Sequence, residues 1–176
     1  MSEKDVASWN AMIMGFDQLG FLDRVLILFY EMRFMGLKPD SITVKGLTQL
    51  SSYEKNLNMV KVINCFGNQI GIGEDVSVIN TWIAAYAKCN NLGLAEKVFH
   101  GIPTDWRTVV SWNSMIGGYA YLEKFVKAIS FYQLMCRSGV RPDISTILSL
   151  ISSSVHPEVL IKGKLIDAHG IRWDAI

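Results

Sequence analysis

The chain has 176 residues, of which 50% are hydrophobic, and 17 lysines and arginines nearly balance 16 aspartates and glutamates. This length suits a single domain, and a net charge of +1 argues against a duplex-binding protein that depends on neutralising many phosphates. The longest apolar stretch, Val25 to Tyr30, is far too short to span a bilayer. We recognise no signal-peptide or transit-like segment before the repeated part of the chain.

The sequence repeats itself. The segment from Ser111 to Tyr119 restates Ser8 to Phe16, and Met135 to Asp143 restates Met32 to Asp40. A period of roughly 34 residues is typical of helix-turn-helix repeats. The predicted units are 6–40, 41–75, 76–108, 109–143 and an incomplete fifth unit at 144–176. Because such a unit cannot bury its apolar face alone, we expect one all-α superhelical solenoid over 1–176.

Within each unit the apolar residues follow helical spacing. The first unit has two apolar stripes, which consist of Trp9, Met12, Ile13 and Phe16, and of Val25, Leu28, Phe29 and Met32. Gly20 lies between the stripes, and Ser8 and Ser111 stand where a hydroxyl would cap the first helix of units one and four. We therefore expect ten helices, two per unit, with the last pair imperfect.

Units one and four end on the same five-residue pattern, at Gly36 to Asp40 and at Gly139 to Asp143. Glycine is the usual residue in a left-handed helix cap, and the proline that follows cannot continue a helix. The pattern predicts that a helix ends at each of these glycines.

Polar residues recur at fixed places. Asparagine recurs as Asn10, Asn80 and Asn113 near the start of the first helix of a unit, and aspartate closes units as Asp40, Asp75 and Asp143. A side-chain amide offers donors and an acceptor to a base edge. A local interpretation remains open, because asparagine in a first turn often bonds locally and aspartate after proline often caps the next helix.

The tryptophans at Trp9, Trp82 and Trp112 share the apolar stripe with Ile13, Ile83 and Ile116. We therefore place them in the core and not in a base-stacking ladder. Trp106 and Trp173 lie outside the stripe.

Together these residues resemble the pentatricopeptide repeat family, the organellar RNA-binding solenoids. Val109 to Ile116 and Met135 to Asp143 look like its standard repeat. Unit three, through Tyr86 to Cys89 and Ala95 to Phe99, resembles the short repeat of the plant subclass that alternates standard, long and short forms. Unit two and the fifth unit, through Gly163 to Gly170, look like long repeats.

The resemblance implies a right-handed superhelical α-solenoid that binds single-stranded RNA by modular recognition, with about one base per repeat. It also implies a mitochondrial or chloroplast location and a part in RNA processing or RNA editing. Unit three is slightly longer than the usual short repeat, at Asp105 to Thr108.

By the same resemblance, each base is recognised by the recurring asparagine position together with the last residue of the unit. The four base-recognition pairs are Asn10 with Asp40, Lys45 with Asp75, Asn80 with Thr108, and Asn113 with Asp143. In the family, asparagine with aspartate implies uracil, so uridine is favoured at units one and four. Asparagine with threonine implies a pyrimidine at unit three, and no base is assigned to unit two. The base-flanking position is occupied by Ala7, Ile42, Ser77 and Val110.

Catalysis has little support in the sequence. His156-Pro157-Glu158 matches half of a zinc deaminase signature, but no Pro-Cys-x-x-Cys follows it. The cysteines Cys65, Cys89 and Cys136 are far apart, which suggests a reducing compartment without a disulfide framework. Cys89 and Cys136 fit buried helical packing. We expect no enzyme activity, metal or cofactor.

Two alternatives remain. A protein-binding scaffold of the tetratricopeptide type would use the same concave face for peptides, and Lys45 would suit a degenerate array that serves only as a spacer. The apolar residues Leu160, Ile161, Leu165 and Ile166 lack a following unit, so we also expect possible self-association through uncapped ends.

Overall fold

The structure is a computed structural model that describes residues 5–152. These residues form nine α-helices, one short 3-10 helix and no strand. The helices are α1 (Val6–Gln18), α2 (Leu22–Phe34), α3 (Ser41–Tyr53), α4 (Leu57–Gln69), α5 (Val76–Lys88), α6 (Leu92–Gly101), α7 (Val109–Tyr121), α8 (Phe125–Arg137) and α9 (Ile144–Ser152), and the 3-10 helix η1 is Thr104–Trp106. The tenth helix expected from the sequence, and the four apolar residues from Leu160 to Ile166, lie outside the described residues.

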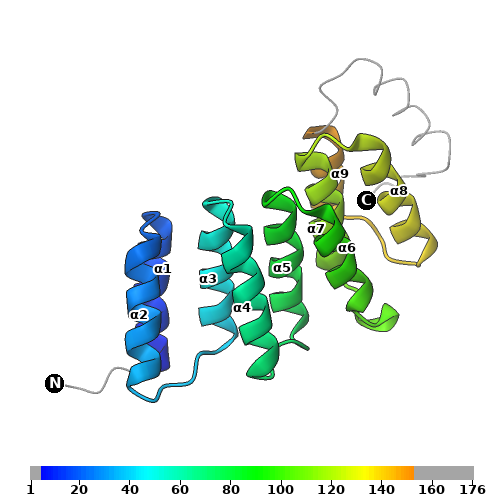
Figure 1. The fold of residues 1–176 in the computed structure, drawn as a ribbon. Helices are drawn as coiled ribbons and strands as arrows, with labels where there is room; N and C mark the ends of the chain where they lie inside the picture. Colours follow the sequence, from blue (N-terminus) through cyan, green and yellow to red (C-terminus); the bar gives the residue numbers. More distant parts are fainter. Residues whose placement is uncertain (1–4, 153–176) are drawn as a thin grey trace.

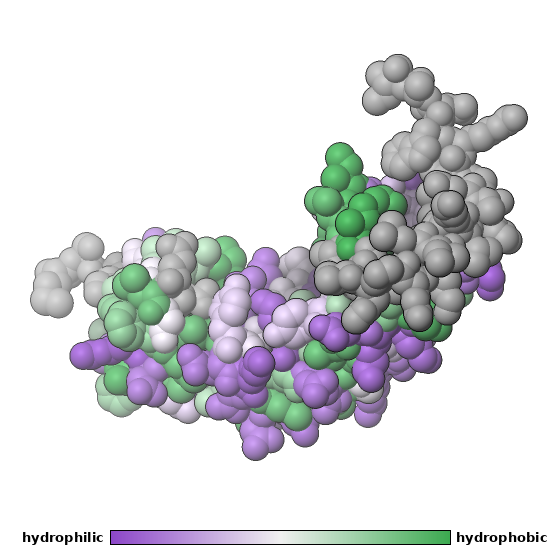
Figure 2. Space-filling view, turned by 90° about the horizontal axis from the view of Figure 1, so that it is seen from above, coloured by the Kyte–Doolittle hydropathy of each residue, from purple (hydrophilic) through white to green (hydrophobic). Residues whose placement is uncertain are grey.

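The helices are arranged in two rows that run the length of the molecule (Figure 1). The first helices of the units, α1, α3, α5, α7 and α9, each pack against the next one. The second helices pack mainly on the first helix of their own unit and on that of the following unit. Because the first row is close-packed and the second row is spread apart, the array curves, and the hollow seen from above lies along the first row (Figure 2). The expected all-α solenoid is confirmed.

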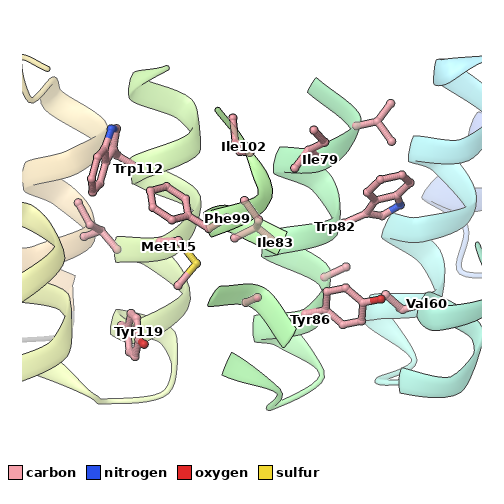
Figure 3. Packing of buried hydrophobic residues seen from close by; sticks show 14 of the residues in the cluster. Val60, Ile79, Trp82, Ile83, Tyr86, Phe99, Ile102, Trp112, Met115 and Tyr119 are labelled. Carbon is pink, nitrogen blue, oxygen red and sulfur yellow. The ribbon is translucent and has the colours of Figure 1, made fainter. Parts of the chain in front are cut away.

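One hydrophobic core runs through successive units (Figure 3). Trp9, Trp82 and Trp112 are 4%, 2% and 1% exposed, so the prediction that they belong to the core is confirmed. Phe99 of α6 lies edge-on to Trp112, with ring centroids 4.9 Å apart, and therefore joins unit three to unit four. Trp106 is exposed, and Trp173 lies outside the described residues. Among residues 5–152, every helix is too short or too polar to cross a bilayer.

The glycine ends of α2 and α8 behave as predicted. Gly36 and Gly139 both have φ of +76°, in the left-handed region. The N–H of Leu37 donates to the carbonyl of Met32 at 3.2 Å, and the N–H of Gly36 donates to that of Arg33 at 3.0 Å. These two bonds are the Schellman pattern, which satisfies carbonyls that a helix end leaves open.

The predicted caps at Ser8 and Ser111 are wrong. Because α7 begins at Val109, its cap is Thr108, whose hydroxyl accepts from the N–H of Ser111 at 3.4 Å. Ser111 is the third helical residue and completes a capping box by accepting from the Thr108 N–H. In unit one, Asp5 accepts the N–H of Ser8 at 2.8 Å. Each helix begins earlier than its apolar stripe suggested.

The predicted burial of two cysteines also needs correction. Cys136 is exposed, and Cys89, the residue that follows the last turn of α5, is only half-buried against the core. Cys65 is exposed as well.

Close approach of neighbouring units depends on small residues. A Cβ built on Gly67 of α4 would lie 2.6 Å from Cζ2 of the Trp82 ring, and one built on Gly118 of α7 would lie 2.7 Å from Cβ of Ala87. Both distances are shorter than carbon atoms tolerate, so glycine sets the spacing between units at these two places.

We predict that Gly67→Ala lowers the free energy of unfolding by about 1–3 kcal/mol, because the new methyl group must displace the Trp82 ring. Gly15→Ala is the matched control. It also lies within a helix, but its new Cβ would meet nothing within 4 Å, so helix propensity alone should raise stability by about 1 kcal/mol. Urea unfolding followed by circular dichroism measures both, and equal effects of the two substitutions would contradict the packing argument.

Candidate functional site

The recurring asparagine of unit one lies against the last residue of its unit. Nδ2 of Asn10, in α1, donates to Oδ1 and Oδ2 of Asp40 at 2.9 and 3.0 Å. Oδ1 of Asn10 lies 2.6 Å from Oγ1 of Thr43, which is the third residue of unit two. Asn10 is only 4% exposed. The contact therefore joins two successive units near the start of the first helix of each. These first helices, α1, α3, α5, α7 and α9, line the hollow of the array (Figure 2) and are called the inner helices below.

Unit four repeats this arrangement. Nδ2 of Asn113 donates to Oδ1 of Asp143 at 2.9 Å, and Oγ1 of Thr146 lies 2.6 Å from Oδ1 of Asn113. Asn113 is half-buried. The two predicted pairs that share the same residue types thus also share the same geometry.

The aspartates have a second role as helix caps. Asp40 accepts the N–H groups of Ile42 and Thr43 at 3.0 and 2.9 Å, and Asp143 accepts that of Thr146 at 2.9 Å. Asp40 and Asp143 therefore cap a helix and contact an asparagine at the same time, because one carboxylate has enough acceptor sites for both.

Unit three differs. Among the described residues, no hydrogen bond joins Asn80 to Thr108. The Thr108 hydroxyl instead accepts the N–H of Ser111 at 3.4 Å and lies 3.3 Å from its Oγ. Asn80 is 7% exposed, and its Oδ1 is buried without a hydrogen-bond partner. A groove of about 450 Å³ lies here, with Ser77, Asn80, Thr108 and Val110 in its lining.

The pair predicted for unit two is not in contact. Lys45 reaches toward Ser77 of unit three, with Nζ 3.4 Å from its Oγ. Asp75 instead accepts from the hydroxyl of Ser41 at 2.7 Å and from the N–H of Ser77 at 2.8 Å. Within the part of the chain that the structure describes, no hydrogen bond joins Lys45 to Asp75.

The four base-flanking positions are all exposed at the start of the inner helices. They are Ala7, Ile42, Ser77 and Val110. Ile42 and Val110 present large apolar side chains to solvent, whereas Ala7 and Ser77 present small ones.

Sequence analysis missed Thr43 and Thr146. Each follows an aspartate by three residues, in Asp40-Ser41-Ile42-Thr43 and in Asp143-Ile144-Ser145-Thr146. This is the spacing of a capping box, so the signal was present. It also missed Lys88, which lines the unit-three groove and lies over the ring of Tyr53, with Nζ 4.2 Å from the ring centroid.

Hydrogen bonds keep the aspartates ionised. The N–H of Thr146 and then the Asn113 amide lower the pKa of Asp143, and the Ser41 hydroxyl, followed by Ser77, lowers that of Asp75. Burial raises the pKa of Asp40, but the bonds from the Thr43 N–H, Asn10 and the Thr43 side chain together hold it below its ordinary value of 3.8. The site therefore carries a row of negative charges at neutral pH.

Among residues 5–152, no group of three or more histidine, cysteine, aspartate or glutamate side chains is placed to hold a metal ion. His156 and Glu158 lie outside the described residues.

The fold and the repeated polar contacts define a modular helical-repeat protein whose inner face carries one polar position per unit. Family models agree: one described as PPR repeat matches residues 7–37 and 77–104, and one described as PPR repeat family matches 107–156. The chain belongs to the pentatricopeptide repeat family.

Two Arabidopsis thaliana relatives illustrate the similarity. The chain is 43% identical over 97% of its length to the mitochondrial pentatricopeptide repeat-containing protein At4g19191, and it covers 26% of that protein. It is 31% identical over 99% of its length to the chloroplastic protein At4g25270 and covers 33% of it. The chain therefore spans a quarter to a third of these relatives.

Solved structures share the fold. The pentatricopeptide repeat protein PPR10 in complex with an 18-nt psaJ RNA element matches 86% of this chain and 22% of its own length, with a TM-score of 0.72 at 23% identity. PPR10 from maize matches 95% of this chain and 24% of its own, with a TM-score of 0.69 at 21% identity.

We predict that the chain loses stability in acid. A group whose pKa is lower in the folded state contributes stability that is complete above its unfolded pKa and is lost as pH falls through the folded value. Asp40, Asp75 and Asp143 are such groups. The midpoint of thermal unfolding should therefore be flat near neutrality and fall below about pH 4.

The substitution Asp40→Asn keeps a capping acceptor but removes the charge, so it should make that acid-induced fall smaller. An unchanged pH profile in Asp40→Asn would contradict the role given to its carboxylate.

Proposed function

We propose that this chain binds single-stranded RNA along the inner face of its solenoid, with about one base for each unit and no catalysis of its own. The observation that carries the proposal is the recurrence of one polar geometry. Asparagine and aspartate meet at 2.9 Å in both unit one and unit four, beside the exposed flanking positions. A repeated geometry suits a repeated ligand, and a nucleic acid is one.

The amide has capacity left for a base. Asn10 and Asn113 each use their nitrogen toward an aspartate and their oxygen toward a threonine. One N–H and one lone pair then remain on the Asn113 amide. The Asn10 nitrogen lies within hydrogen-bond distance of both Asp40 oxygens, and one lone pair remains on Oδ1 of Asn10. A donor beside an acceptor is complementary to the Watson–Crick edge of uracil, which presents a carbonyl beside the ring N–H. We therefore assign uracil to units one and four, and a pyrimidine to unit three by its Asn80 and Thr108.

The flanking side chains would hold the base in place. Ile42 and Val110 are exposed and apolar beside the polar positions, so a base plane can pack against each of them and lose water. Stacking contacts of this kind contribute about 1–3 kcal/mol per base with aromatic partners, and aliphatic partners contribute less. Binding by four units should consequently be weak, since ordering the strand opposes it.

The charge distribution leaves base selection to the polar positions. Among the described residues that line the unit-three groove, Lys88 is the only one with a positive charge. The net charge of +1 leaves little nonspecific attraction to phosphates. Discrimination among bases would therefore come from the polar positions and not from the electrostatic attraction between the protein and the phosphates.

The relatives support the same proposal. The PPR10 structure contains an RNA element, and the names of related Arabidopsis proteins include mitochondrial and chloroplastic locations. We propose that this chain is part of an array of such repeats and helps to select the RNA site at which organellar RNA processing or editing takes place.

A protein-binding scaffold of the tetratricopeptide type is the alternative. It shares the architecture but would need unit-specific pockets for peptide side chains. The matching geometry of units one and four favours the RNA proposal, because a peptide seldom presents the same group at two places three units apart.

We predict that Asn113→Thr changes the base preferred by unit four from uracil toward guanine, as the family's pattern implies, and leaves unit one unchanged. Titration of short RNAs that differ only at the fourth base, followed by fluorescence anisotropy, measures this. The register is uracil, any base, a pyrimidine and uracil, from 5′ to 3′ along units one to four.

The control is Ile116→Ala, which removes a fully buried side chain of α7 and should weaken binding of all bases together through lost packing. An equal loss for every fourth base in Asn113→Thr, or no change, would favour the scaffold alternative.

We also propose that the two ends of the described array self-associate with a second copy of the chain. Phe34 is 94% exposed at the end of α2. Ile144 and Leu148 are exposed on α9, four residues apart and hence on one face. In units one to four, the residues at the positions of Ile144 and Leu148 are buried or half-buried.

We predict that sedimentation velocity shows a concentration-dependent shift toward a dimer, and that Phe34→Ser with Leu148→Ser reduces it. Tyr121→Ser changes an exposed residue at the end of α7 and should have no effect. A sedimentation coefficient that is independent of concentration in the wild type would rule out the idea.

A further inference from the structure

We infer that base selectivity depends on a third residue that belongs to the following unit, because its hydroxyl fixes which way the base-recognition asparagine faces. Thr43 does this for Asn10, and Thr146 does it for Asn113. The inference deepens the proposed function and rests on it. Thr43 and Thr146 are positioning residues, since they act through the asparagine and not on the base.

The orientation of an asparagine amide is decided by its partners, because its nitrogen only donates and its oxygen only accepts. The ionised carboxylate of Asp40 can only accept, so the group of Asn10 that faces it must be the nitrogen. Oδ1 then points toward Thr43. The 2.6 Å contact between Oγ1 of Thr43 and that oxygen fixes the other side of the amide.

The hydroxyl of Thr43 has a single hydrogen, and its best acceptor is Asn10. Oγ1 lies 2.6 Å from Oδ1 of Asn10 but 3.0 Å from Oδ1 of Asp40. That carboxylate oxygen already accepts from Asn10, Ile42 and the Thr43 N–H. Thr43 itself accepts the Asp40 N–H at 3.2 Å. The direction of each hydrogen bond in this cluster is thus defined. In unit four, Oγ1 of Thr146 lies at the same two distances from Asn113 and Asp143.

Unit three lacks both constraints. Thr108 stands where the aspartate would be, and a hydroxyl can donate or accept, so it does not dictate which end of the Asn80 amide faces it. Ser111 stands where the threonine would be, and its Oγ accepts from the Thr108 N–H at 3.2 Å. The same Oγ lies 3.3 Å from Oγ1 of Thr108, and Oδ1 of Asn80 is buried without a partner. The amide of Asn80 is free to present either end to the groove.

This difference has a consequence for base selection. From ring position 4 to position 3, uracil presents an acceptor and then a donor, whereas cytosine presents a donor and then an acceptor. A fixed amide matches only one of these orders when the base is held in one orientation. An amide that can turn over matches both. Units one and four should therefore distinguish uracil from cytosine, and unit three should accept either pyrimidine.

The first experiment removes the hydroxyl. In Thr43→Val, the ratio of affinities for uracil and cytosine at the first base should fall about fivefold, the size of one net hydrogen bond, while the ratio at the fourth base stays as it was. Thr146→Val should do the reverse. Thr48→Val is the matched control, because Thr48 is equally buried and bonds only to the Val44 carbonyl at 2.7 Å. Titration of RNAs that differ at one pyrimidine measures the ratios.

The second experiment installs the missing constraints in unit three. Thr108→Asp together with Ser111→Thr should give the third base a preference for uracil over cytosine of about fivefold. The preference should be larger than that produced by Thr108→Asp alone. If Ser111→Thr adds nothing to Thr108→Asp, or if Thr43→Val weakens uracil and cytosine alike, the hydroxyl has no part in selectivity and the inference is overturned.

A measurement without RNA separates this inference from the proposed function. In the free protein, the side-chain amide resonances of Asn10 should shift in Thr43→Val and those of Asn113 should not, and Thr146→Val should give the opposite pattern. Unmoved Asn10 resonances in Thr43→Val would overturn the positioning role itself. If the resonances respond as expected but no RNA binds, the positioning role stands and the proposed function fails.

Discussion

The close packing of successive inner helices is the constraint from which the rest of this molecule follows. A helix pair of this length leaves one apolar face uncovered, so each unit requires the next. Gly67 against Trp82 and Gly118 against Ala87 set how near two units come. This spacing brings the start of one inner helix against the start of the next. The first helices of successive units lie side by side along the array (Figure 1), so the polar positions of neighbouring units lie close together.

One carboxylate both caps a helix and contacts the asparagine of a proposed base-recognition pair. Asp40 accepts two backbone N–H groups of α3 while it also holds the amide of Asn10. A helix needs a cap at this point whatever the ligand is. Under the proposed function, stability and base selection are consequently linked at units one and four. In unit three, Thr108 provides the cap without a charge, which leaves the neighbouring asparagine unconstrained.

The units differ in how much each is organised before a ligand arrives. Asn10 and Asn113 are held from both sides, Asn80 has an unsatisfied oxygen, and Lys45 reaches across to the following unit. Groups that are already oriented lose less freedom when they bind. Under the proposed function, the ends of the described array would impose selectivity, and the middle would tolerate variation.

The sequence by itself determined the period, the helix pairs, the buried tryptophans and the helix ends at Gly36 and Gly139, because these depend on local spacing and backbone preference. It placed Asn10 and Asp40 at repeated positions but could not show that they touch. The caps were misplaced at Ser8 and Ser111, since an apolar stripe marks a helix face and not its first residue. Only the tertiary structure showed Thr43 against Asn10 and the unpartnered oxygen of Asn80. Those features depend on distances between units, which are set by side-chain packing. The spacing of Asp40 and Thr43 indicates a helix cap, but no pattern within one repeat indicates the contact with Asn10.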